Sequence, residues 1–233
     1  MSNSAYHRLS LVLFVLALLL LVWAWYHVFL VVPTERTMGT IQRIFYIHLP
    51  SAFVSFLAFF VVFLGSLGYL LTRRPHWDWV AASAAEIGTI FCAAVLLTGP
   101  LWAKPVWGIW WTWDARLTTT LVLFLIFVGY LMLRQYVGEA DRRARLAAVV
   151  GIVGFLDVPI VYMANRWWRT QHPAPVIAGG EASGLDPRMW VGVLWSLAAL
   201  ATFAGLVFVQ RYRLEGMRAE LTRLARRAGR RGE

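Results

Sequence analysis

The chain has 233 residues, a net charge of +10, 60% hydrophobic residues and 15% charged residues. Soluble domains carry about 45–50% apolar and about 25% charged residues, so this composition excludes an ordinary soluble globule. It also excludes a disordered chain, and the one cysteine, Cys92, excludes a disulfide scaffold. Uninterrupted apolar runs predict an all-α integral membrane protein rather than a β-barrel.

Six apolar stretches are each long enough to cross a bilayer as a helix. Their lengths of 19–24 residues match the number that a helix needs to span the hydrocarbon core. They cover residues 9–32, 50–71, 79–99, 115–133, 146–164 and 189–209. The sequence therefore predicts one six-helix membrane domain over residues 1–212, beginning with an uncleaved signal anchor, and a basic tail over residues 213–233.

The distribution of basic residues predicts the orientation of this domain. With the N-terminus inside, the inner segments hold 15 of the 22 Lys and Arg residues, eight of them from Arg211 onward, and the outer segments hold 7. Because positive charge favours the cytoplasmic side, we expect both termini to be cytoplasmic. The outer cations run against this rule, and an anionic ligand on the outer face would explain them.

Tryptophan is concentrated in outer loops, where seven of the 13 tryptophans lie. The densest segment reads WGIWWTWD, from Trp107 to Asp114. An aromatic belt at the membrane interface accounts for one or two rings at a helix end, but not for four rings in seven positions. If the segment is helical, Trp107, Trp110, Trp111 and Asp114 share one face, which predicts an apolar wall that ends in a carboxylate.

Two neighbours complete this segment. Trp113 would point away from the wall and is the better candidate for an interfacial belt residue. Gly108 removes a side chain next to the wall, which would let a flat ligand approach the backbone. The segment thus favours either a large planar apolar ligand or an apolar patch on a partner protein.

Two histidines flank the tryptophan-rich loop in the predicted topology. His48 stands in YIHLP, where Pro50 predicts the first turn of a helix, and a helix N-terminus favours the neutral imidazole that binds metals. His172 follows two tryptophans and two arginines in NRWWRTQHP, in the last outer loop. Together they are typical of a pair of axial ligands for haem iron, with tryptophans for the macrocycle and outer arginines for the propionates.

Two acids fall inside predicted spans, where charge is costly. For Glu86 and Asp157 we expect hydrogen bonds between helices, although a proton path is an alternative. Asp157 is followed by Pro159, so it is also suited to a locally broken helix.

At these residues the sequence resembles a known family. The stretch WGIWWTWDARLT resembles the tryptophan-rich WWD signature of haem-handling membrane proteins. Its continuation DARLT, together with YIHLPSA and NRWWRTQHP, resembles the CcmC family of cytochrome c maturation. The resemblance covers nearly the whole chain and implies six spans in the bacterial inner membrane, with a haem site that faces the periplasm.

The resemblance also implies roles for residues and partners. His48 and His172 would be axial ligands of a non-covalent, transient b-type haem. The haem edge would contact the residues of the WWD segment, namely Trp107, Gly108, Trp110, Trp111, Trp113 and Asp114. The implied partners are the haem chaperone CcmE, which receives the haem, the ATP-binding-cassette pair CcmA and CcmB, and the one-span protein CcmD.

Other classes remain as alternatives. An intramembrane b-type cytochrome would need histidines that face each other within the spans. A transporter or permease subunit would need broken helices and polar residues near the midplane. A third alternative is a non-haem assembly subunit whose tryptophan-rich loop docks a partner. We expect no nucleic-acid partner, and no nucleophile–base pair indicates an enzyme, although assistance in attaching haem to the chaperone is left open by the sequence.

Overall fold

The computed structural model describes residues 3–170, 172 and 185–229, and the regular structure in these ranges is helical. Six of its helical segments are long and apolar enough to cross a membrane, which confirms the predicted number of spans. The α-helices are α1 (Asn3–Tyr26), α2 (Phe45–Thr72), α3 (Pro75–Trp107), α4 (Ala115–Tyr136), α5 (Ala140–Phe155), α6 (Asp157–Trp167) and α7 (Pro187–Gly229). A π-helical turn (His27–Val31) continues α1, and a 3-10 turn (Thr40–Ile44) leads into α2.

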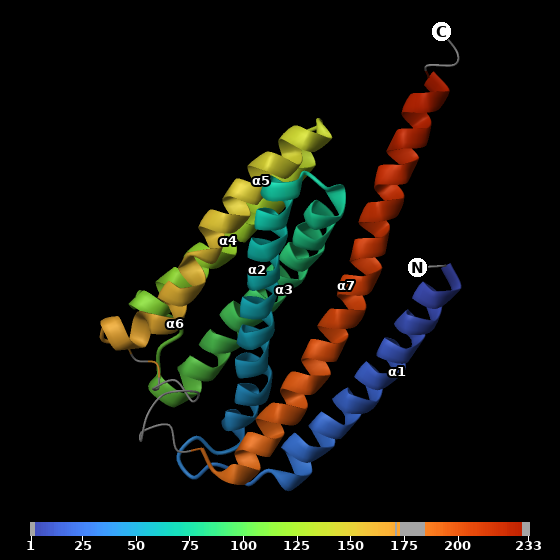
Figure 1. Ribbon diagram of the computed structural model, residues 1–233. Helices are drawn as coiled ribbons and strands as arrows, with labels where there is room; N and C mark the ends of the chain where they lie inside the picture. Colours follow the sequence, from blue (N-terminus) through green and yellow to red (C-terminus); the bar gives the residue numbers. More distant parts are fainter. Residues whose placement is uncertain (1–2, 171, 173–184, 230–233) are drawn as a thin grey trace.

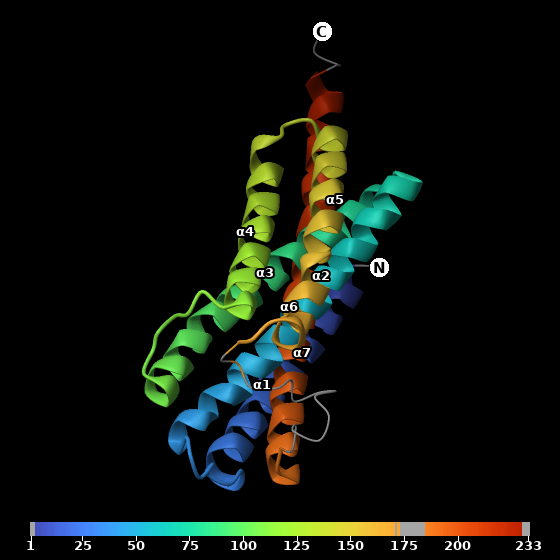
Figure 2. The same cartoon turned by 90° about the vertical axis from the view of Figure 1, so that its left-hand side faces the viewer.

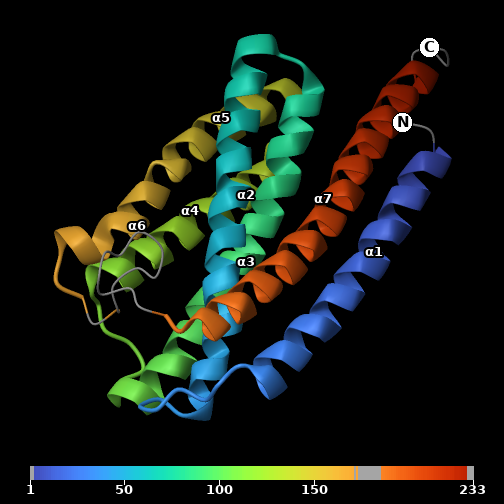
Figure 3. The same cartoon turned by 60° about the horizontal axis from the view of Figure 1, so that its bottom comes forward.

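The spans form a bundle with α2 and α3 at its centre. Figure 1 places α4, α5 and α6 on one flank of this pair and α7 and α1 on the other. Figure 2 shows α4 and α5 running side by side, and Figure 3 shows α1 following α7. The start of α1 and the end of α7 point toward the side of the bundle that carries the α2–α3 and α4–α5 turns, which we call the termini end (Figure 1). The opposite end, which carries residues 32–44, residues 108–114 and His172, is called the loop end.

Local sequence signals explain several helix boundaries. Pro75 is the first residue of α3, where its missing N–H costs nothing. The same helix stops at Gly108, whose φ of 75° is a left-handed conformation that glycine adopts without strain. The fifth span breaks at Leu156 into α5 and α6, because Pro159 cannot donate to the carbonyl four residues earlier.

The two intramembrane acids behave differently. Glu86 of α3 pairs with Arg211 of α7, so the expected interaction between helices is confirmed there. Asp157 sits at the predicted helix break, but its buried Oδ2 has no hydrogen-bond partner among the described residues. The expectation of a bond between helices is therefore wrong for Asp157, which lies beside a broken backbone rather than opposite a donor.

Small residues allow α2 and α3 to pack closely. A Cβ atom added at Gly65 would lie 3.0 Å from the backbone nitrogen of Ala81, so the two helices nearly touch there. Farther along, Gly88 receives the ring of Phe59, which is fully buried and stacks on Phe127 of α4 with 3.8 Å between ring centroids. This contact ties α2, α3 and α4 into one core.

The last helix is much longer than a bilayer requires. α7 has 43 residues, or about 65 Å at 1.5 Å per residue, against a hydrocarbon core of about 30 Å. It runs without interruption through residue 213, where the basic tail is expected to begin. The division into a membrane domain and a tail stays a prediction.

Replacing Gly88 by alanine tests the core contact. The new Cβ would lie 2.5 Å from the Phe59 ring, which cannot move away because it stacks on Phe127. We expect Gly88→Ala to destabilise the protein by about 1–3 kcal/mol. Thermal unfolding in mild detergent measures this.

The matched control is Gly129→Ala in α4, where an added Cβ meets nothing within 4 Å. Because alanine is the better helix former, this variant should be neutral or more stable by up to about 1 kcal/mol. Equal stability of the two variants would contradict the close packing of Phe59 on Gly88.

Candidate functional site

A small cavity at the loop end brings together both predicted histidines and most of the tryptophan-rich segment. Its volume is about 20 Å³, about the space for one water molecule. Of the eight predicted site residues, six line it: His48, Trp107, Trp110, Trp111, Asp114 and His172. A second small cavity lies on the bundle side of both histidines and is lined also by Cys92, Arg116 and Thr120. The two histidines thus separate the loop from the bundle interior.

The hydrogen bond that holds His48 fixes its tautomer. Nδ1 of His48 lies 2.9 Å from Oγ1 of Thr98 in α3. That hydroxyl donates its hydrogen to the carbonyl of Ala94 at 2.7 Å, so it accepts from the imidazole. Nδ1 therefore carries the proton, and Nε2 of His48 keeps a free lone pair that can bind a metal.

His172 is held more loosely. Its Nδ1 is buried, lies 3.8 Å from Oδ2 of Asp114, and has no hydrogen-bond partner in the described part of the chain. Burial, reinforced by the nearby guanidinium of Arg116, lowers the pKa of His172 to about 4. A depressed histidine pKa means that the imidazole stays neutral at every pH well above 4, which is the form that binds metals.

A chain of ring contacts links the two histidines. Ring centroids lie 6.0 Å apart for His48 and Trp102, 6.3 Å for Trp102 and Trp107, and 6.2 Å for Trp107 and His172. Trp102 and Thr98 are site residues that the sequence did not single out. They lie four residues apart on the last turns of α3 and share a face, but this spacing is common in any helix and does not by itself mark a site.

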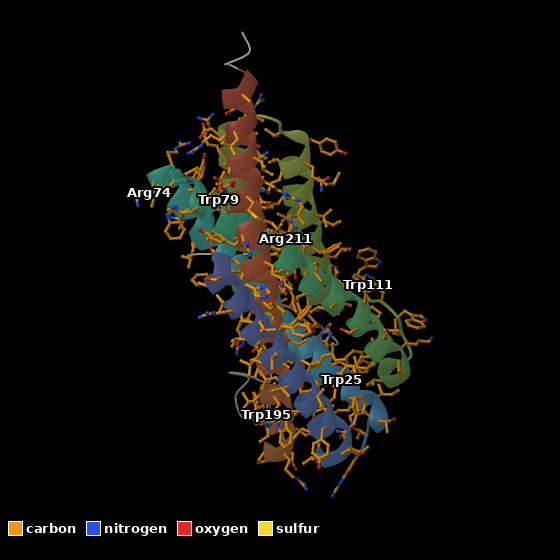
Figure 4. The ribbon with its side chains drawn as sticks, turned by 90° about the vertical axis from the view of Figure 1, so that its right-hand side faces the viewer. Trp25, Arg74, Trp79, Trp111, Trp195 and Arg211 are labelled. Carbon is orange, nitrogen blue, oxygen red and sulfur yellow. The ribbon has the colours of Figure 1, made fainter. Side chains whose placement is uncertain are left out.

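The expectation that the WWD segment forms one helical face is wrong. α3 ends at Trp107, Gly108 turns the chain, and residues 109–114 are not helical. Trp110 and Trp111 still line the cavity, because the loop folds back from the end of α3 toward the start of α4. Figure 4 shows Trp111 beside this loop. Gly108 lines no part of the cavity, and its left-handed φ gives the physical reason for glycine.

Trp113 follows the prediction that it points away. It does not line the cavity, its side chain is 76% exposed, and it meets Trp111 edge to face at 5.6 Å between ring centroids.

Lys104, in the last turn of α3, contacts the tryptophan-rich loop. Its Nζ donates to the carbonyl of Gly108 at 3.0 Å and lies 6.0 Å from the ring centroid of Trp110.

The expected helix start at Pro50 is also wrong. α2 begins at Phe45, directly after a 3-10 turn, so Pro50 lies inside the helix. His48 is the fourth residue of α2, in its first turn, with a 3-10 turn before the helix. The bond to Thr98 sets which ring nitrogen carries the proton.

Asp114 is the N-cap of α4. Its Oδ1 accepts from the backbone N–H groups of Arg116 and Leu117 at 3.0 and 3.1 Å, and its Oδ2 accepts from the Thr112 hydroxyl at 2.9 Å. The guanidinium of Arg116 in turn donates to the side-chain oxygen of Asn165 in α6. These bonds fix α4, α6 and the end of the tryptophan-rich loop around the histidines.

Asp114→Ala removes three accepted hydrogen bonds. Loss of an N-cap costs about 0.5–2 kcal/mol, so we expect a lower unfolding temperature in detergent and faster hydrogen exchange at Arg116 and Leu117. Asp114→Asn keeps a side-chain acceptor and should lose less. Wild-type stability and exchange in the alanine variant would contradict a capping role.

The family model CcmC, described as heme exporter protein C, matches residues 2–227. A heme exporter protein C from Bradyrhizobium diazoefficiens is 40% identical over 192 residues, which cover 82% of this chain and 71% of the relative. The heme exporter protein C of Escherichia coli K12 is 29% identical over 191 residues, which cover 82% of this chain and 76% of that relative. The one of Haemophilus influenzae is also 29% identical over 191 residues, which cover 82% of this chain and 78% of that relative. The chain belongs to the CcmC, heme exporter protein C, family.

Proposed function

We propose that this membrane protein binds haem as cargo between His48 and His172 and presents it for the maturation of c-type cytochromes. The observation that carries the proposal is that two neutral imidazoles from distant parts of the chain border one tryptophan-lined cavity. The name that these relatives share, heme exporter protein C, agrees with this cargo.

The donor set fits haem. Neutral imidazole nitrogens are common axial ligands of haem iron, and His48 offers Nε2 because its Nδ1 proton is held by Thr98. Both oxygens of Asp114 already accept hydrogen bonds, Oδ1 the capping bonds and Oδ2 the bond from the Thr112 hydroxyl, so the imidazoles are the better iron ligands. Trp102, Trp107 and Trp111 supply the apolar surface that a macrocycle needs.

The size of the cavity implies a moving part. Pockets for ligands of drug size or larger hold about 300–1,000 Å³, far more than the about 20 Å³ here. The cavity is covered by residues 109–114, which are not helical and which turn at Gly108. We therefore propose that this loop swings outward about Gly108 when haem binds, while His48 stays on its helix.

Charge and exposure support the orientation and the partners that the resemblance implies. The arginine-rich half of α7 lies at the termini end, which we assign to the cytoplasm of a bacterial inner-membrane protein, so the haem site faces the periplasm. Beside the site, Trp110, Trp113 and Trp167 are 55%, 76% and 56% exposed. We propose this surface as the contact for the haem chaperone CcmE, with CcmA, CcmB and CcmD as further members of the complex.

The exposed tryptophans also favour a second candidate, a non-haem assembly subunit that docks a partner through the same loop. Absorption spectra of the purified protein separate the two functions. We expect a Soret band in the wild type after haem supplementation, and a weakened and shifted band in His48→Ala and in His172→Ala, because each loses one iron ligand. Both variants should also fail to load the chaperone.

The control is His76→Ala at the termini end, which should keep the wild-type spectrum. A wild type that takes up no haem, or histidine variants with unaltered spectra, would contradict the proposal and favour the docking function.

Thr98→Val tests the hydrogen bond between Nδ1 of His48 and the Thr98 hydroxyl. Without the hydroxyl, the Nδ1 proton loses its acceptor and the imidazole is no longer oriented, so haem affinity should fall about 10–100-fold. Thr89→Val is a matched control, since Thr89 lies on the same helix and its hydroxyl, among the described residues, bonds only to the carbonyl of Ala85. Haem titration followed at the Soret band gives the haem affinity of each variant. Equal affinities of the two variants would contradict a role of Thr98 in orienting His48 as an iron ligand.

A further inference from the structure

A much larger cavity lies at the termini end, away from the histidines. Its volume is about 1350 Å³, and its walls come from α2, α3, α4, α5 and α7. We call it the termini-end cavity. It surrounds the junction of α3 and α7 where Figure 4 shows Trp79 and Arg211, well away from the loop with Trp111. The proposed haem function uses none of its residues.

The acidic side chains of this cavity are all paired with arginines. Asp78 accepts two hydrogen bonds from Arg134, at 2.5 and 3.0 Å, and both side chains are about nine-tenths buried. Glu86 pairs with Arg211, and Glu215 lies 2.9 Å from Arg218. The fourth acid, Asp141, lies 3.2 Å from Arg145 and accepts a hydrogen bond from the Tyr69 hydroxyl at 2.6 Å.

The lining of the termini-end cavity carries more positive than negative charge. The lining contains six arginines against four acidic residues. Arg143 of α5 and Arg223 of α7 make no ion pair with the described residues, and Nε of Arg143 is buried without a hydrogen-bond partner. A buried guanidinium nitrogen without an acceptor is costly, which applies to Arg143, while Arg223 adds an exposed positive charge on another wall, so together they favour an anionic ligand.

The same cavity has an apolar wall at the depth where the spans end. Trp79, Leu131 and Leu221 line it. The neighbouring helix ends, at Thr72, Pro75 and Tyr136, lie where the apolar sequences give way to charged ones, which is the level of lipid headgroups. A ligand that fits must join an anionic group to an apolar body. The volume exceeds that of most small-molecule pockets, which hold about 300–1,000 Å³.

We propose that the termini-end cavity binds the phosphate headgroup and the upper acyl chains of an anionic phospholipid, with Arg143 and Arg223 as the phosphate ligands. Basic pockets between membrane helices are suited to such headgroups. The bound lipid bridges α5 and α7, which no ion pair joins within the described part of the chain. It thereby stabilises the part of α7 that extends past the hydrocarbon core.

The test uses the full-length protein in nanodiscs that contain phosphatidylglycerol or only phosphatidylcholine. Native mass spectrometry counts retained lipid, and thermal unfolding measures stabilisation. We expect phosphatidylglycerol to be retained and to raise the unfolding temperature of the wild type. In Arg143→Gln/Arg223→Gln, its apparent affinity should fall about 10–30-fold, the factor expected for two lost lipid contacts.

The matched control is Arg74→Gln/Arg142→Gln. It removes the same charge from the same end of the bundle, but both side chains are exposed and neither lines the cavity (Arg74 is labelled in Figure 4). It should bind phosphatidylglycerol as the wild type does. Circular dichroism confirms that both double variants fold.

Four results would overturn the proposal. One is equal lipid retention in both double variants, and another is equal stabilisation by phosphatidylcholine. The third is saturation of the effect by inorganic phosphate or glycerol phosphate alone, which would indicate a soluble anion. An acidic peptide that stabilises the protein when phosphatidylglycerol does not would indicate a protein partner, and would also count against the lipid.

Discussion

The close packing of α2 against α3 is the constraint on which the rest of the structure depends. Gly65 leaves no room for a side chain against the backbone of α3, and Gly88 is covered by the ring of Phe59, so a backbone contact and one fixed aromatic ring set the relative position of these helices. His48 stands near the start of α2 and Thr98 near the end of α3, and the 2.9 Å bond between them requires this placement. The core thus determines which nitrogen of His48 is free.

The architecture could be predicted from the sequence because a span is a local property of about twenty apolar residues. The segment 108–114 could not, because helical spacing among Trp107, Trp110 and Trp111 is also compatible with a loop. Gly108 adopts a left-handed conformation that ends one helix, and Asp114 caps the start of the next. These two residues determine the conformation of the segment more strongly than the spacing of its tryptophans. The start of α2 was missed for a related reason, since a proline is tolerated five residues into a helix when a 3-10 turn precedes it.

The site residues also divide into those that could be identified from the sequence and those that could not. His48, His172 and Asp114 were identifiable as unusual residue types in outer segments, and the fold brings them to one cavity. Thr98, Trp102 and Arg116 were not, since their importance comes only from what they touch. Arg116 is an example: on the sequence it is one of several outer cations, whereas in the structure it lies with both histidines on one cavity wall and bonds to α6.

The two histidines are held unequally, and this bears on a protein that must give up its cargo. His48 is fixed by a helix on a tightly packed core and by the bond to Thr98. His172 lies outside the helices, its Nδ1 has no hydrogen-bond partner in the described part of the chain, and Asp114 is 3.8 Å away. Among the described residues, moving His172 therefore breaks fewer hydrogen bonds than moving His48. In the proposed function, release begins at His172 and the tryptophan-rich loop, while His48 keeps the cargo in place until the chaperone supplies a ligand of its own.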